Sequence, residues 1–195
     1  FSRFVQLLVN LTSQEIFSSQ LGRELNISPK TAQRWLNILV STYQWTELPH
    51  FSGNTIKRIS GKNKGYFIDT GMICHLMRLS SPEALLGFPR LGALFETWVV
   101  QDILKQLDVI STQPAKYHWR THAGAEVDLI LEWNNRYFPI EIKCKTQITK
   151  NDLSGIKAFR STYPTLDIAP SLVIAPVKTI QKIDDEVYAV PFDIK

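Results

Sequence analysis

The 195-residue sequence lacks any apolar run that approaches the ~20 residues of a membrane-spanning helix. It is also poor in cysteine: Cys74 and Cys144 are far apart and match no metal-binding or redox spacing. We therefore expect a cytoplasmic protein without a membrane segment, whose two thiols stay unpaired in a reducing compartment.

A phosphate-binding loop of the form G-x-x-x-x-G-K-[ST] is absent as well, because Gly61-Lys62 lacks the rest of this motif. ATP binding is therefore not expected within these residues. The first residue is Phe1 rather than Met, and it lies inside a helical pattern. We expect the sequence to be the C-terminal part of a longer protein.

What is present is typical of a folded protein, with 44% hydrophobic and 21% charged residues. The net charge of +4 is distributed unevenly. Residues 1–85 contain nine Lys and Arg against five Asp and Glu, whereas residues 86–195 contain thirteen of each kind. A basic first part suits a polyanionic partner such as DNA.

The first part of the sequence, residues 1–85, has the pattern of a helix-turn-helix domain. Amphipathic spacing predicts a helix at Phe1–Leu11. Two more helices, at Ser18–Leu25 and Pro29–Thr42, are expected around a tight turn, with Ser28 as the N-cap of the second. Because this second helix has a polar, basic side, the pattern predicts a helix-turn-helix.

Three strand-like segments follow, at Trp45–Phe51, Ile56–Ile59 and Tyr66–Ile68, and would form a wing. Basic side chains of the second helix and of the wing are expected to contact DNA. They are Lys30, Arg34, Lys57, Arg58, Lys62 and Lys64. The alternative is a winged helix that contacts protein, with the same charges facing solvent.

A segment with two prolines and Gly87, Ser80–Arg90, predicts a boundary between domains 1–85 and 86–195. The second domain should combine helices and strands in an α/β arrangement (α+β for the whole chain) with a mixed central sheet. The expected elements are a helix at Leu91–Leu107, a strand at Lys116–Arg120, a hairpin, a helix at Asn151–Ser161 capped by Asn151, and strands at Ser171–Ala175 and Val187–Pro191.

The hairpin lies within Ala125–Lys145, where two apolar runs, Val127–Leu131 and Tyr137–Cys144, flank a polar turn. Strand side chains alternate between faces, so Glu126 and Asp128 should share one face of the first strand. Val127, Leu129 and Leu131 should lie on the other face.

Charged residues inside both strands of the hairpin could form a chemical site. Paired across the hairpin, Asp128, Glu141 and Lys143 would lie together. Two carboxylates can bind a hard divalent cation, and a nearby lysine can orient or deprotonate a water at that metal. The alternative is an ordinary salt-bridged sheet edge, which carries such charges to prevent aggregation. Glu126 is either an extra acid or a polar partner of Arg120.

Several short motifs occur in an order that resembles the PD-(D/E)XK, or restriction-endonuclease-like, nuclease superfamily. They are Phe95-Glu96 on a helix, Gly124–Leu131 and Pro139–Lys143. With the helix-turn-helix and Tyr66–Gly71, the sequence also resembles the C-terminal region of a family of prokaryotic P-loop (AAA-type) ATPases. In that family a winged helix and a nuclease-like domain of unknown function follow the ATPase module.

This resemblance implies roles for particular residues. Glu96, Asp128 and Glu141 would bind Mg²⁺ or Mn²⁺, and Lys143 would position the attacking water or stabilise developing charge. These four residues are the expected catalytic set. Three more residues would face the substrate: Arg120, His122 and Lys145.

The expected function is therefore the DNA-binding and nuclease-like part of a prokaryotic P-loop ATPase, with Mg²⁺-dependent phosphodiester hydrolysis. ATP would bind only to an N-terminal module outside this sequence, and that module and DNA are the expected partners. The alternative is a non-catalytic DNA- or protein-binding assembly module of the same ATPase. The sequence is compatible with an oligomer.

Overall fold

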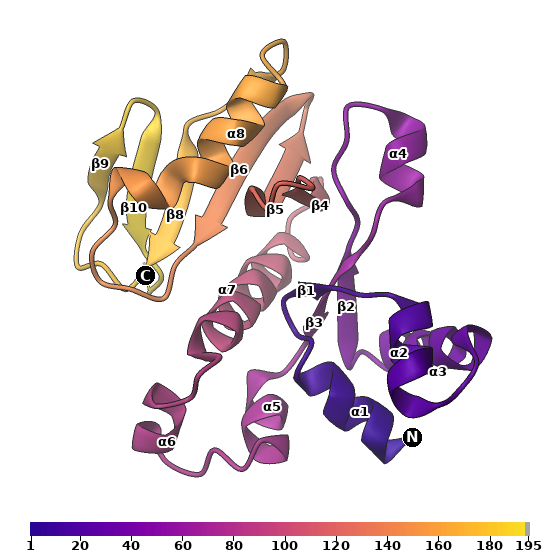
Figure 1. Cartoon of the computed structure of the whole chain (residues 1–195). Helices are drawn as coiled ribbons and strands as arrows, with labels where there is room; N and C mark the ends of the chain where they lie inside the picture. The colour runs from indigo at the N-terminus through magenta and orange to yellow at the C-terminus, as the bar shows by residue number, and fades with distance from the viewer. Residues whose placement is uncertain (194–195) are drawn as a thin grey trace. The chain divides into compact units, whose positions relative to one another are not determined.

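The computed structural model of the chain describes residues 1–193, with the side chains of Thr55 and Lys57 left undescribed. Helices and strands form two compact units (Figure 1), and this mixture of helix and mixed sheet confirms the predicted α+β class. The first unit consists of Phe1–Leu48 and Lys62–Gln101. The second consists of Pro49–Gly61 and Asp102–Lys195.

The first unit surrounds a small sheet with helices. Its strand order is β1-β3-β2, and both pairings are antiparallel. Helices and strands share one apolar core, which includes Phe4, Leu36, Trp45 and Phe67. The elements are α1 (Ser2–Val9), β1 (Gln14–Glu15), α2 (Ser18–Leu25), α3 (Pro29–Ser41), β2 (Trp45–Leu48), β3 (Lys64–Phe67), α5 (Thr70–Leu76), α6 (Pro82–Leu86) and most of α7 (Leu91–Leu107).

Local signals explain how the helix pair α2–α3 forms. Asn26 ends α2 in the left-handed conformation (φ 54°), which asparagine adopts more readily than most residues. The Ser28 hydroxyl then accepts a hydrogen bond from the Thr31 amide at 3.0 Å, and Pro29 occupies the first turn of α3. The predicted cap and the predicted second helix are confirmed.

Residues 49–61 differ from the expected wing. Thr55–Ser60 form helix α4 rather than the strand expected at Ile56–Ile59, and the Asn54 side chain accepts a hydrogen bond from the Ile56 amide at 2.9 Å. Phe51 is fully buried, and its amide donates to the His118 carbonyl of the second unit at 2.7 Å. The segment therefore groups with the second unit, and residues 86–101 group with the first, so the compact units do not follow the expected ranges 1–85 and 86–195.

The second unit is built on a mixed sheet with the strand order β4-β5-β6-β8-β10-β9, in which β7 also pairs with β6. The pairs β6–β8, β8–β10 and β6–β7 are parallel, and the others are antiparallel. The strands are β4 (Ala115–Arg120), β5 (Glu126–Trp133), β6 (Arg136–Ile142), β7 (Asp167–Ile168), β8 (Ser171–Ala175), β9 (Gln181–Asp184) and β10 (Val187–Pro191). The unit also contains α4, the end of α7, the 3-10 helix η1 (Lys150–Leu153) and α8 (Ser154–Thr162).

Helix α8 lies across the sheet (Figure 1), and its buried residues Ile156 and Phe159 enter two apolar clusters that also contain strand residues. The helix approaches β5 closely at Gly155, where an added Cβ would lie 1.7 Å from the Glu126 carbonyl oxygen. The expected cap is corrected: Thr149, rather than Asn151, precedes η1 and forms a capping box with Asp152.

Both cysteines, Cys74 and Cys144, are free thiols, as predicted. Across the described residues, the helices are too short or too polar to traverse a lipid bilayer.

Candidate metal centre

Backbone pairing between strands β5 and β6 ends next to the predicted site residues Asp128 and Glu141. The backbone ladder runs from the pair Trp133–Arg136 to the pair Leu129–Ile140. Beyond it, the Ile142 amide donates to Asp128 Oδ2 at 2.9 Å, so a carboxylate replaces a backbone carbonyl as the acceptor. Because β6 remains paired with β8 as far as Ile142, this amide is fixed in the sheet. Asp128 is only 2% exposed.

On the other side of β5, the strict alternation of faces is interrupted. Tyr117 pairs with Ile130 but Trp119 pairs with Val127, so β5 has one more residue than β4 between these pairs. Such a β-bulge changes the direction of side chains locally. As a result Val127 and Ile130 enter the same apolar cluster, and the predicted grouping of Val127 with Leu129 and Leu131 is wrong. The bulge lies at Asp128 and its neighbour Leu129.

Glu141 and Lys143 form a close ion pair at the end of β6. The Lys143 ammonium lies 2.6 Å from Glu141 Oε1. Glu141 is only 3% exposed, and its other oxygen, Oε2, has no hydrogen-bond partner among the described residues. Leaving a buried acceptor unsatisfied costs about 1–3 kcal/mol, and more for a charged group. A cation placed at Oε2 would remove this cost.

Burial and neighbouring charges shift the pKa values of both members of this pair. Burial, and then the charge of Asp128, raise the pKa of Glu141 well above its usual range, although Lys143 opposes this shift. Burial would lower the pKa of Lys143, but the attraction of Glu141, Asp128 and Glu126 outweighs it, so the pKa is raised. Perturbed pKa values of this kind cluster at functional sites, which makes this end of β6 a candidate site.

Glu96, the fourth residue of the expected catalytic set, belongs to the first unit. Its Oε1 lies 2.6 Å from the Lys64 ammonium and accepts a hydrogen bond from the Tyr66 hydroxyl at 2.7 Å. Lys64 is only 4% exposed, so it is not placed to contact DNA from the surface, contrary to expectation. The structure thus brings Asp128, Glu141 and Lys143 together in one unit, while the Glu96 carboxylate is engaged by residues of the other.

The three residues expected to face a substrate have different environments. Arg120 pairs with Glu126 at 3.2 Å, and both side chains are partly exposed. His122 is exposed in the turn between β4 and β5. Lys145 is half-exposed and forms an ion pair with Asp152.

The remaining residues expected to contact DNA also differ among themselves. Lys30 and Arg34 are exposed on α3. Lys62 is half-exposed, 3.8 Å from Glu15, and its ammonium lies over the Phe17 ring. The Lys57 side chain lies outside the described residues.

Arg58 has a structural position in the second unit rather than the expected place on a wing. Its guanidinium pairs with Glu132 at 3.2 Å and stacks over the Phe51 ring at 4.5 Å.

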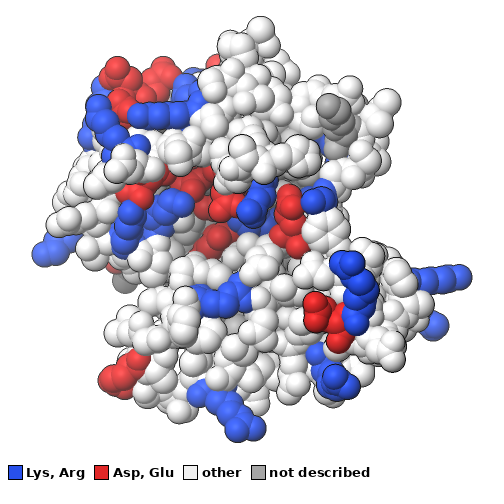
Figure 2. All heavy atoms as spheres, in the orientation of Figure 1, with Lys and Arg blue, Asp and Glu red and all other residues white. Residues whose placement is uncertain are grey.

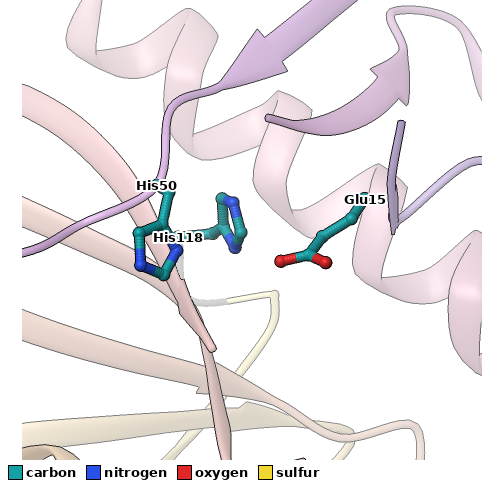
Figure 3. A group of neighbouring side chains, drawn as sticks. All are labelled: Glu15, His50 and His118. Atoms are coloured by element: carbon teal, nitrogen blue, oxygen red, sulfur yellow. The ribbon is translucent and has the colours of Figure 1, made fainter. Parts of the chain in front are cut away.

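Two histidines of the second unit, His50 and His118, were not distinguished by any sequence motif. They form an isolated parallel bridge, and their ring centroids lie 5.4 Å apart. Figure 3 shows the pair, together with Glu15, which belongs to the first unit. Two imidazoles are fewer than the three protein ligands of a typical catalytic zinc site, so the pair alone does not define a metal centre.

Comparison with known protein families assigns the chain to a family. A family model described as Domain of unknown function (DUF4143) matches residues 91–194, which is more than half of the sequence, and the chain belongs to this family. A second model, Domain of unknown function (DUF8612), matches residues 1–83. The two matches lie on either side of a short segment within Ser80–Arg90.

Individual relatives are similar over nearly the whole chain. The uncharacterized proteins Rv2008c of Mycobacterium tuberculosis and Mb2031c of Mycobacterium bovis are each 30% identical over 187 residues, covering 96% of this chain. The chain spans 40% of the length of these curated relatives. Among solved structures, protein VC1899 from Vibrio cholerae matches with 14% identity and a TM-score of 0.31, over 96% of this chain and 47% of that one. At this TM-score the likeness supports no conclusion about fold or function.

Proposed function

We propose that Asp128 and Glu141 bind a hard divalent cation, Mg²⁺ or Mn²⁺, and that this site hydrolyses phosphodiester bonds in DNA. The observation that carries the proposal is the unpartnered Oε2 of Glu141, buried beside a second buried carboxylate. Carboxylate oxygens are the protein ligands that Mg²⁺ prefers. The order of the motifs, which resembles the PD-(D/E)XK nucleases, supports the same chemistry.

Each residue would have a distinct part in the reaction. A bound Mg²⁺ supplies an activated water and neutralises charge on the phosphate. Asp128 is held by the Ile142 amide, so its second oxygen is oriented before any ligand arrives. The Lys143 ammonium, beside Glu141, would donate a hydrogen bond to the attacking water or to a phosphate oxygen and so stabilise developing negative charge.

Calorimetric titration with Mn²⁺ tests the metal site directly. We expect the wild-type chain to bind Mn²⁺ and Asp128→Asn to bind at least about tenfold more weakly, because a charged ligand is lost. Asparagine is preferable to alanine, because an amide oxygen can still accept from Ile142, whereas alanine would leave that amide unsatisfied. Asp167→Asn, which removes an exposed carboxylate paired with Arg136, is the matched control and should bind normally. Absence of Mn²⁺ binding by the wild type at millimolar concentration would contradict the proposal.

DNA would be held by the exposed side of α3. Lys30, Gln33, Arg34 and Asn37 are all exposed there, and the Gln33 side chain donates to Asn37 Oδ1 at 3.0 Å. Arginine and lysine contact phosphates and guanine, while glutamine and asparagine suit adenine. On the face that Figure 2 shows, basic side chains are interspersed with acidic ones, so the proposal rests on this helix rather than on the overall charge.

Arg34→Ala should weaken DNA binding about three- to tenfold and reduce the slope of log affinity against log salt by about one, as expected when one phosphate contact is lost. The measurement is fluorescence anisotropy with a labelled duplex at several salt concentrations. Lys157→Ala, which removes an exposed lysine paired with Asp184 in the second unit, should change neither quantity. Equal affinity and slope in Arg34→Ala and the wild type would exclude this helix as the DNA contact.

A protein-binding assembly role is the second candidate, and one observation favours it. Ile38 and Val40 in the last turn of α3, and Tyr43 just after this helix, are 43%, 44% and 80% exposed. Exposed apolar side chains are a feature of surfaces that contact other proteins. If α3 contacts a protein, Arg34→Ala will leave DNA binding unchanged.

For the full-length protein we propose a prokaryotic P-loop ATPase, of which this chain is the C-terminal, cytoplasmic part. This chain spans 40% of the length of the curated relatives, and an ATPase module would lie in the part of such a protein that the match does not cover. Its phosphate-binding loop should be sought in the rest of the gene, since the 195 residues do not contain one.

A further inference from the structure

Glu126 is a partly exposed carboxylate that lies close to Asp128 in the sequence. It is the first residue of β5 and lies two residues before Asp128. Helix α8 fixes its backbone, because Gly155 packs against the Glu126 carbonyl with no room for a Cβ. The side chain is 38% exposed, so it can reorient toward a ligand without disrupting the core.

The Glu126 carboxylate is paired with Arg120 at 3.2 Å, and the two residues are opposite each other in the β4–β5 ladder. Val127, the residue between Glu126 and Asp128, enters the apolar cluster of the second unit, so by strand alternation Glu126 and Asp128 lie on the opposite face of β5. Glu126 is therefore the acidic residue that precedes Asp128 on the same face of the strand.

The other candidate for a third carboxylate is Glu96, which the nuclease resemblance implies. In the first unit its Oε1 is already bound by an ammonium and a hydroxyl, from Lys64 and Tyr66. Recruiting Glu96 to a metal would leave the buried Lys64 ammonium without this partner, which is costly. Recruiting Glu126 would break only a partly exposed ion pair, which contributes little stability.

We infer that Glu126, rather than Glu96, is the third carboxylate ligand of the metal site, and that Arg120 is its partner in the absence of metal. This inference rests on the metal site proposed above. When Glu126 turns to the cation, Arg120 is released, and its guanidinium can bind a phosphate oxygen of the substrate. The ligand class is a hard divalent cation bound entirely by oxygen.

Mn²⁺ calorimetry on the full 195-residue chain tests the assignment with variants that should change affinity in opposite directions. Glu126→Gln should weaken Mn²⁺ binding at least about tenfold, because a charged ligand is lost. Arg120→Met should tighten Mn²⁺ binding about two- to fivefold, because the ion pair with Arg120 competes with the metal for Glu126. This range corresponds to the energy of an exposed ion pair. Glu186→Gln removes an exposed glutamate paired with Arg160 and should change nothing.

The outcomes separate this inference from the proposed function. Unchanged affinity in Glu126→Gln, with loss of binding in Asp128→Asn, would overturn the role of Glu126 and leave the metal site intact. A large loss in Glu96→Gln, with wild-type affinity in Glu126→Gln, would assign the third ligand to Glu96 instead. Absence of Mn²⁺ binding by the wild type would remove the proposed site and this assignment with it. A purely structural Arg120–Glu126 pair would leave both variants with wild-type affinity.

Discussion

Replacing Lys143 by methionine should reduce Mn²⁺-dependent cleavage of plasmid DNA by at least about 10²-fold while leaving Mn²⁺ binding in place. Removing one preorganised donor that stabilises transition-state charge commonly costs 10²–10³ in rate. The ammonium lies 2.6 Å from Glu141 Oε1, so in the free protein it competes with a metal for this carboxylate. Its loss should therefore keep or increase metal affinity. Methionine retains most of the side-chain volume, which limits changes in packing.

Two measurements are needed to test this prediction, one of metal binding and one of the cleavage rate. Calorimetry shows whether Lys143→Met still binds Mn²⁺, and nicking of supercoiled plasmid gives the rate. Lys157→Met, a change of the same kind at an exposed position of α8, should cleave at the wild-type rate. Wild-type cleavage by Lys143→Met would exclude Lys143 from the chemistry. Metal binding without cleavage by the wild type itself would instead favour the assembly role.

Most of the site could be predicted from sequence because local rules determine it. The hairpin places Asp128 near Glu141 and Lys143 through pairing and side-chain alternation alone. The structure reproduces this grouping through the Ile142–Asp128 hydrogen bond and the Glu141–Lys143 ion pair. The β-bulge at Asp128 and Leu129 could not be predicted, because it depends on where β4 pairs, which no pattern within β5 encodes.

Long-range partners could not be predicted either. Lys64 lies in a basic, glycine-containing segment that suggests a solvent-exposed loop. In the structure its ammonium is buried against Glu96, which lies 32 positions later on α7. Sequence spacing does not show that a lysine has such a partner. The motif that predicts Glu96 as a metal ligand likewise does not show its contacts with Lys64 and Tyr66.

Short apolar segments are ambiguous for another reason. Ile56 and Ile59 are three residues apart, a spacing compatible with a helix as well as with a strand, and a short run does not decide between them. Their side chains are 76% and 82% exposed in α4, so no core contact selects the conformation. In contrast, Leu91–Leu107 is long and strongly patterned, and its predicted bounds agree with α7.

Gly155→Ala should be among the most destabilising single substitutions in the second unit. The added methyl group would lie 1.7 Å from the Glu126 carbonyl oxygen and 2.9 Å from its carbon, and neither backbone atom can rotate away. Either α8 or β5 must therefore shift. Overpacking a core typically costs 1–3 kcal/mol, and a backbone clash places this site at about 3 kcal/mol or more. We expect Tm to fall by at least about 6 °C, measured by circular dichroism.

Gly92→Ala is the matched control, because a Cβ at Gly92 would meet no atom within 4 Å. This residue lies near the start of α7, where alanine favours the helix by up to about 1 kcal/mol, so Tm should stay constant or rise. A Gly155→Ala variant as stable as the wild type would show that α8 can move away from β5. The Mn²⁺ affinity of the folded fraction then becomes informative, because a shift of the Glu126 backbone displaces the carboxylate assigned here as the third ligand. Wild-type stability with weakened Mn²⁺ binding would locate the role of Gly155 in positioning Glu126 rather than in holding the fold together.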